Sequence, residues 1–368
     1  MSKRILLVGG GTGGHVFPLM AVADSLQKLA AQQGQNLELI LLGEGKFFSE
    51  AAKRSGLKYK KFMAGKFRRY FSLANLIDLP KILIGLIQSF WYLFWLMPDA
   101  IFTKGGYASV PPALVAKLFF IPIYIHDSDA IPGAANRLIG RWAKKVFISF
   151  EMARSYFPVG KTELTGNPIR QEILNGDRNQ ALQFLQLSDQ LPTVLVLGGS
   201  QGAQKINEII LQSLSKLTMK FQVIHQSGES NYEAVKKSVE QIRPANYHLY
   251  TFFDSSTLSL AYASADVVVS RAGANLLSEI SAVGKPAILI PLSRKASRGE
   301  QITNAIELSR YGAIIIEEDN LVPSVLIDQI EHAYQNRAEL GAKIKNFASL
   351  DAADKIASQL LTQFVSLL

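Results

Sequence analysis

The 368-residue chain contains no cysteine. This absence excludes disulfide bridges and thiolate metal sites, and it is typical of proteins kept in a reducing compartment. The chain starts with Met-Ser-Lys-Arg and only four apolar residues before the first glycine, so we expect no signal peptide. Because 48% of the residues are apolar, a sizeable core can form, and the length predicts two domains rather than one.

Acidic residues are missing between Glu50 and Asp78, where basic residues are frequent. The whole chain has a formal charge of +9, which favours anionic partners such as nucleotides or anionic lipid. Charge of either sign is then absent from residues 82–97, which are bracketed by Pro80 and Pro98. This run falls slightly short of the ~20 residues that span a bilayer. It predicts a buried core helix beside a solvated basic loop, an interfacial membrane anchor, or a mixture of the two in which one helix face is buried and the other touches lipid.

Glycine is concentrated directly after two apolar segments. Residues 5–8 run into a turn with five glycines, residues 193–197 run into residues 198–203 (GGSQGA), and a helical pattern follows each turn. A strand, a tight turn and a helix N-terminus in this order offer backbone N–H groups and a helix dipole to phosphate. His15 follows the first turn, where its imidazole could do acid–base chemistry. The repeat predicts two doubly wound, Rossmann-like α/β domains facing each other across a cleft.

Polar clusters follow two further predicted strands. Residues 126–129 (HDSD) come after residues 121–125, and their Asp-x-Asp pattern could bind a divalent metal, orient a sugar or assist a base. A turn of small residues follows residues 267–269 and opens a helix, in which Glu279 could accept hydrogen bonds from a ribose. Each cluster alone is a weak signal.

The first glycine loop also satisfies the dinucleotide pattern G-x-G-x-x-G. In such sites an acidic residue about 20 positions further on holds the ribose. Here only Glu44, at the end of the next predicted strand, is a substitute. A nicotinamide oxidoreductase is therefore a minor alternative.

Seven motifs follow one another along nearly the whole chain. They are residues 10–18 (GGTGGHVFP), 105–107 (GGY), 166–170 (GNPIR), 198–203 (GGSQGA), 225–228 (HQSG), 270–274 (SRAGA), and Gln301 with Asn304-Ala305. Together they closely resemble the MurG family of bacterial cell-wall transferases, within glycosyltransferase family 28. The resemblance implies the GT-B fold and an inverting transfer of N-acetylglucosamine from UDP-GlcNAc to the muramoyl 4-hydroxyl of lipid I, the undecaprenyl-diphosphate-linked muramoyl-pentapeptide. The product would be lipid II for peptidoglycan synthesis, made without a cofactor or metal.

The resemblance also divides the substrates between the domains. Residues 165–349 would bind the UDP-sugar, and residues 1–164 would bind the acceptor and dock on the membrane, with a C-terminal helix at about 350–368 packed back on them. The acceptor diphosphate and donor sugar would lie near Thr12, Gly13 and Gly14. The donor would contact Arg170, Ser200, the backbone of Phe253, Ala274, Asn275, Leu276, Leu277, Ser278, Glu279, Gln301 and Asn304.

His15 is the first candidate for the base that removes the proton of the acceptor hydroxyl. Helix N-termini and Arg170 would stabilise the departing UDP. Many relatives read His-Glu-x-Asn where this chain reads residues 126–129, so Asp129 offers a carboxylate in place of an amide. Asp127 and Asp129 are therefore alternative bases.

A lipid-linked acceptor requires docking at the bilayer, so we expect peripheral association with the cytoplasmic face of the cell membrane. The anionic surface would be met by Lys58, Lys60, Lys61, Lys66, Arg68 and Arg69 and by Phe90, Trp91 and Trp95. No nucleic-acid partner is expected. Another GT-B lipid glycosyltransferase, a UDP-N-acetylglucosamine 2-epimerase and a non-catalytic UDP-sugar-binding membrane scaffold remain as alternatives.

Overall fold

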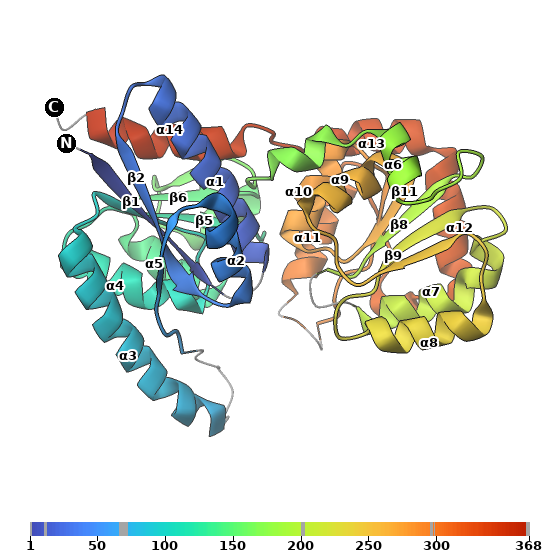
Figure 1. Cartoon of the computed structure of the whole chain (residues 1–368), viewed down its shortest axis with the longest axis horizontal. Helices are drawn as coiled ribbons and strands as arrows, with labels where there is room; N and C mark the ends of the chain where they lie inside the picture. The colour runs from blue at the N-terminus through green and yellow to red at the C-terminus, as the bar shows by residue number, and fades with distance from the viewer. Residues whose placement is uncertain are drawn as a thin grey trace. The chain divides into compact units, whose positions relative to one another are not determined.

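The computed structural model describes residues 2–10, 13–65, 73–199, 203–294, 297 and 299–365. The chain divides into two compact units (Figure 1). The N-terminal unit comprises Met1–Ile169 and Leu350–Leu368, and the C-terminal unit comprises Arg170–Ser349. Five residues expected at sites lie outside the described part: Thr12, Lys66, Arg68, Arg69 and Ser200.

The N-terminal unit contains a parallel sheet with the strand order β3-β2-β1-β4-β5-β6-β7 within the described residues. Its strands are β1 (Lys3–Gly10), β2 (Leu37–Glu44), β3 (Lys58–Lys61), β4 (Ala100–Thr103), β5 (Ile123–Asp127), β6 (Lys145–Ile148) and β7 (Thr162–Leu164). Its helices are α1 (Gly13–Gln32), α2 (Lys46–Ser55), α3 (Leu73–Leu96), α4 (Val110–Leu118), α5 (Ala134–Trp142) and α14 (Ala352–Val365), with short 3₁₀ helices η1 (Tyr107–Ser109) and η2 (Glu151–Tyr156).

Helices cover both faces of this sheet, which explains the unbroken apolar run in β1. Ile5 and Leu7 point into a core with α1 and α14, whereas Leu6 and Val8 point into a second core with α4 and α5. Successive side chains of a strand alternate between faces, so a strand covered on both faces is apolar throughout. The C-terminal helix α14 thus belongs to the N-terminal unit, packed beside α1 (Figure 1).

The C-terminal unit repeats the design with the strand order β10-β9-β8-β11-β12-β13 within the described residues. Its strands are β8 (Thr193–Leu197), β9 (Gln222–Gln226), β10 (Tyr247–Tyr250), β11 (Val267–Ser270), β12 (Ala287–Leu289) and β13 (Ile314–Ile315). Its helices are α6 (Arg178–Phe184), α7 (Gln204–Leu217), α8 (Tyr232–Ile242), α9 (Ser255–Ser264), α10 (Ala274–Val283), α11 (Glu300–Ser309), α12 (Pro323–Gln335) and α13 (Arg337–Lys345), with η3 (Gln171–Asn175) and η4 (Glu318–Asn320). The predicted fold class, two doubly wound parallel α/β domains, is confirmed.

Helix α3 differs from its prediction in two ways. Pro80 lies inside the helix instead of marking its start; a proline removes one helical hydrogen bond, yet here the backbone continues through it. Only 17% of the apolar window Asp78–Leu96 is buried, so the reading as a buried core helix is wrong. One narrow face, containing Gly85, Ser89 and Leu93, packs on the unit, and most of the other apolar side chains are exposed.

The close packing of α3 depends on Gly85. A Cβ at this position would overlap the backbone carbonyl oxygen of Met63, which follows β3. We predict that Gly85→Ala destabilises the N-terminal unit by about 1–3 kcal/mol, because α3 must move away from this segment. All three tryptophans lie in this unit, so urea unfolding followed by tryptophan fluorescence reports the effect. The neighbouring exposed position provides the control Ile84→Ala, and an equal loss in both variants would contradict the prediction.

Candidate functional site

The strand order of the N-terminal unit places a crevice at the carboxyl ends of β1 and β4. From β1 the chain proceeds to β2 and β3 on one side and then to β4 on the other, and ligands of open α/β sheets bind at such a reversal. His15, in the first turn of α1, lies here beside the loop after β4. A Cβ built on Gly106 would be 3.6 Å from the Nε2 atom of His15. The fold therefore brings two of the seven motifs together.

Asn136, on α5, holds the Gly105-Gly106 turn in place. Both glycines have positive φ angles, 79° and 80°, and a side chain on Gly105 would overlap the amide of Asn136. The N–H of Gly106 donates to Asn136 Oδ1 (2.9 Å), while Asn136 Nδ2 donates to Asp127 Oδ2 (2.7 Å). The turn and the end of β5 are thus joined through one buried amide, which was not among the residues predicted from the sequence.

Asp127 and Asp129 occupy different environments. Asp127 is buried, and its second oxygen, Oδ1, accepts a hydrogen bond from the backbone N–H of Asp129 (3.0 Å). Burial and the nearby carboxylate of Asp129 raise the pKa of Asp127 to about 6. Both oxygens of Asp127 are thus engaged by the protein, which favours a role in organising the loop over direct metal ligation. Asp129 is partly exposed.

Lys104 is a second residue that was not predicted. It follows β4 directly, its side chain is buried, and its ammonium contacts His126 Nδ1 (2.6 Å), Ser128 Oγ (2.6 Å) and Asn167 Oδ1 (3.0 Å). Burial lowers the pKa of Lys104 to about 7, although the carboxylates of Asp127 and Asp129 act in the opposite direction. A lysine between an apolar strand and a Gly-Gly turn was the available sequence signal.

The imidazole of His15 is neutral at physiological pH. Burial, and secondly the positive charge of Lys104, lower the pKa of His15 to about 4. The ring also donates a hydrogen bond to the backbone carbonyl of Lys104. A neutral imidazole that donates through one nitrogen has a lone pair on the other, so His15 can accept a proton.

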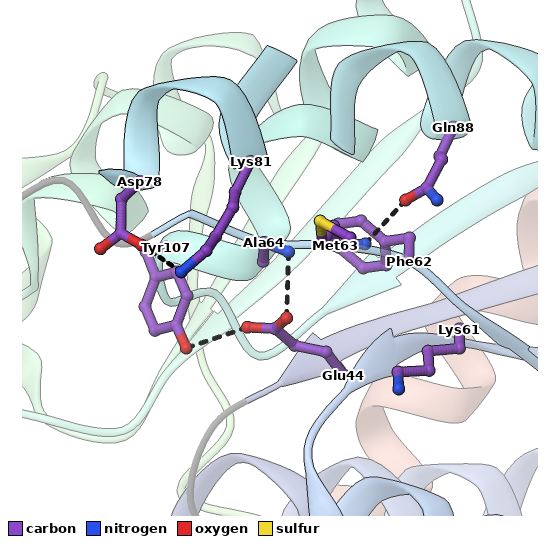
Figure 2. A pocket seen from close by; sticks show the side chains of 9 residues that line it. All are labelled: Glu44, Lys61, Phe62, Met63, Ala64, Asp78, Lys81, Gln88 and Tyr107. Carbon is purple, nitrogen blue, oxygen red and sulfur yellow. Dashed lines mark hydrogen bonds and ion pairs between the residues drawn. The ribbon is translucent and has the colours of Figure 1, made fainter. Parts of the chain in front are cut away.

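A pocket of ≈ 700 Å³ lies beside this crevice and is lined by Tyr107 and by residues of β2, α3 and the segment after β3 (Figure 2). Glu44 accepts hydrogen bonds there from the Tyr107 hydroxyl (3.1 Å) and the Ala64 N–H (3.0 Å). Lys81 pairs with Asp78 at the rim (2.8 Å). Because both oxygens of Glu44 bind the protein, its carboxylate anchors the wall of the pocket.

In the C-terminal unit the corresponding crevice lies between β8 and β11. Gly273 precedes α10 in an extended conformation, and the helix begins at Ala274. The backbone N–H groups at the start of a helix lack intrahelical acceptors and favour anions. The side chains of Leu277 and Ser278 make contacts within the C-terminal unit. Leu277 lies in the core, and the Ser278 hydroxyl donates to the Ala274 carbonyl (2.8 Å).

Glu279 is buried and forms an ion pair with Arg170 (2.9 Å). Arg170 also donates to the Ser255 hydroxyl (2.8 Å), and the Tyr262 hydroxyl donates to the other oxygen of Glu279 (3.4 Å). The structure therefore unites two of the predicted donor-site residues, which are 109 positions apart in the sequence. The pair fixes α10 to the segment before η3.

Three further predicted donor-site residues, Phe253, Gln301 and Asn304, form hydrogen bonds with loops at this edge of the sheet. The N–H of Phe253 donates to Gln226 Oε1 (3.1 Å), and Gln226 Nε2 donates to the Gly199 carbonyl (3.3 Å). Gln301 accepts from the Leu292 N–H (3.2 Å). Asn304 is fully buried and donates to the carbonyl of Ala272 (3.3 Å), just before α10.

Comparisons with known proteins cover both units. Residues 5–148 match the Glycosyltransferase family 28 N-terminal domain, and residues 193–360 match the Glycosyltransferase family 28 C-terminal domain.

Two relatives share the name UDP-N-acetylglucosamine--N-acetylmuramyl-(pentapeptide) pyrophosphoryl-undecaprenol N-acetylglucosamine transferase. That of Legionella pneumophila (strain Paris) is 38% identical over 362 residues, 97% of this chain and 96% of the relative. That of Lachnoclostridium phytofermentans is 39% identical over 355 residues, 96% of this chain and 97% of the relative. The crystal structure of Acinetobacter baumannii MurG matches with a TM-score of 0.72 at 27% identity, covering 98% of this chain and 99% of that one.

The Arg170–Glu279 pair yields a prediction about stability. Arg170→Gln leaves a buried carboxylate without its cation, so we expect a loss of about 3–5 kcal/mol in the free energy of unfolding. Urea unfolding followed by circular dichroism measures it. Lys343→Gln breaks the exposed pair with Glu339 on α13 and provides a matched control, with an expected loss of roughly 0–1 kcal/mol. Similar losses of unfolding free energy in the two variants would contradict the prediction that the buried pair stabilises the unit more than the exposed one.

Proposed function

This chain belongs to glycosyltransferase family 28, as its seven motifs predicted, and from this premise we propose that it transfers N-acetylglucosamine from UDP-GlcNAc to lipid I, forming lipid II. The observation that carries the proposal is the alignment over at least 96% of the chain with relatives named for this transfer. In the sequence of both units, glycine-rich segments directly follow the central strands β1 and β8, and such folds bind phosphorylated ligands at the carboxyl ends of these strands.

We assign UDP-GlcNAc to the C-terminal unit. The start of α10, at Ala274 to Leu276, would bind the diphosphate through backbone N–H groups, and its positive end would stabilise the charge on departing UDP. Glu279 and Arg170 would contact the nucleotide from their fixed ion pair. The same assignment includes the predicted contacts of UDP-GlcNAc with Phe253, Gln301, Asn304 and Ser200. The side-chain contacts of Leu277 and Ser278 favour packing roles for these two.

We assign the acceptor to the N-terminal unit, with His15 as the base. Its free nitrogen would take the proton of the muramoyl 4-hydroxyl while that oxygen attacks the anomeric carbon from the face opposite UDP. The bond from this carbon to the UDP oxygen breaks, and the electron pair leaves with UDP. The support for His15 is its place in the crevice and its neutral state. Asp127 and Asp129 are the alternatives.

We further propose peripheral docking on an anionic membrane through α3. Phe90, Trp91 and Trp95 are 42%, 60% and 66% exposed, and α3 is held to the unit along one face, which favours a helix lying in the interface. An apolar groove of ≈ 730 Å³ between α3 and α4 continues this surface. Lys58, Lys60 and Lys61 of β3 are exposed and would attract anionic headgroups.

The transfer is tested by measuring UDP release from UDP-GlcNAc in EDTA, with and without a lipid I analogue. Acceptor-dependent release supports a metal-independent transferase. Intact UDP-GlcNAc binding without release would instead favour another acceptor or the non-catalytic scaffold.

The same assay tests the base. We predict that His15→Ala lowers kcat by about 10²–10⁴-fold, because the acceptor proton loses its base, while the affinity for UDP-GlcNAc stays near wild type. His332→Ala, at an exposed position on α12, is the matched control and should be silent. Unchanged turnover in His15→Ala would reject His15 and direct attention to Asp127 or Asp129.

Membrane docking is tested by sedimentation with vesicles containing an anionic phospholipid. We predict that Trp91→Ala with Trp95→Ala weakens vesicle binding by roughly 10–100-fold, since two large apolar groups no longer enter the interface. Phe184→Ala removes an exposed aromatic side chain from the C-terminal unit and should have no effect. Equal binding by wild type and the double variant would contradict docking through α3.

A further inference from the structure

The ammonium of Lys104 lies at a junction of three loops. Lys104 follows β4, Ser128 follows β5, and Asn167 follows β7, so the three segments come from separate strands of one sheet. A lysine ammonium has three N–H donors and no acceptor. Its contacts with His126 Nδ1, Ser128 Oγ and Asn167 Oδ1 match these donors one to one.

This match also fixes the state of His126. In its ammonium form Lys104 can only donate, so Nδ1 of His126 accepts, and Nε2 then carries the proton and donates to the Gly166 carbonyl (2.9 Å). Burial, and then the charge of Lys104, lower the pKa of His126 well below its ordinary value. The three groups nearest to the ammonium are therefore all neutral, and the site is built around a single positive charge.

The other side of Lys104 faces the crevice. Its backbone carbonyl accepts the hydrogen bond from the His15 ring, and the next residues, Gly105 and Gly106, form the turn against which His15 lies. Lys104 thus contacts the junction of loops through its ammonium and the His15 imidazole through its backbone carbonyl. We propose that Lys104 is a positioning residue for the reaction: its ammonium ties the loops after β4, β5 and β7 together, and its carbonyl orients His15.

The charge of Lys104 adds a second effect that can be measured. It lowers the pKa of His15, so the imidazole stays unprotonated to a lower pH than burial alone would allow. The charged or titratable groups that act on Lys104 in turn are Asp127 and Asp129, with His126 in direct contact. The proposal rests on the proposed role of His15 as the base.

The test uses the full-length chain with isotope-labelled histidine and follows the titration of His15 by NMR, assigned with His15→Gln. In the wild type we expect a pKa near 4. Lys104→Met removes the charge and the hydrogen bonds, and we expect the pKa of His15 to rise by about one unit. Lys104→Gln removes the charge but keeps two N–H donors, so it gives the same test if Lys104→Met does not fold.

The pH dependence of kcat/KM is measured on the same variants. The base must be unprotonated, so activity falls as pH falls through its pKa, and a raised pKa moves this acid limb upward. A rise of about one unit makes the variant lose up to about tenfold more activity on the acid limb than at pH 8. Lys285→Met, which removes a partly buried lysine of the C-terminal unit, is the control and should change neither readout.

Two results would overturn the proposal. An unchanged His15 titration in both Lys104 variants would show that the two residues are not coupled. A loss of kcat/KM that is equal at every pH would reduce Lys104 to a structural role. If the His15 titration moves but the acid limb does not, the coupling stands and the base role of His15 fails.

Discussion

Every strand of both sheets runs parallel to its neighbours, so the loops that follow the strands gather along one edge of each sheet. This constraint brings together residues that are far apart in the chain. In the N-terminal unit it joins His15, Lys104, residues 126–129 and Asn167, and in the C-terminal unit it joins the Gly198-Gly199 turn to the start of α10. The chemistry proposed for each unit depends on this edge, because an antiparallel arrangement would send alternate loops to opposite ends.

The N-terminal edge places ionisable groups in a dry environment, where a charge without partners is costly. Lys104 meets three neutral acceptors, and Asp127 accepts from Asn136 and from the backbone of Asp129. Burial lowers the pKa of Lys104 to about 7 and raises that of Asp127 to about 6, so both groups titrate near neutrality. A small change in this cluster can therefore shift protons close to His15, which suits a site that removes a proton from a hydroxyl group.

The sequence predicted the two parallel α/β units, because residues 5–8 and 194–197 are apolar and glycine-rich segments follow them directly. It also predicted His15, which adjoins the first turn. It could not predict Lys104 or Asn136, since their roles follow from β4 lying next to β1 and from contacts across 9 to 63 positions. The pairing of Arg170 with Glu279 was hidden for the same reason. The apolar run in α3 did not predict which of its side chains are buried. Their burial depends on the narrow helix face that packs closely on the unit because Gly85 has no side chain.

We propose that the two units divide the substrates, with UDP-GlcNAc in the C-terminal unit. Amide hydrogen exchange of the full-length chain, with and without UDP-GlcNAc, tests this claim directly. We expect slower exchange in peptides that cover residues 271–278, because the diphosphate would bind the N–H groups at the start of α10. Protection confined to the first glycine turn and residues 13–16 would place the donor in the N-terminal unit and contradict the account.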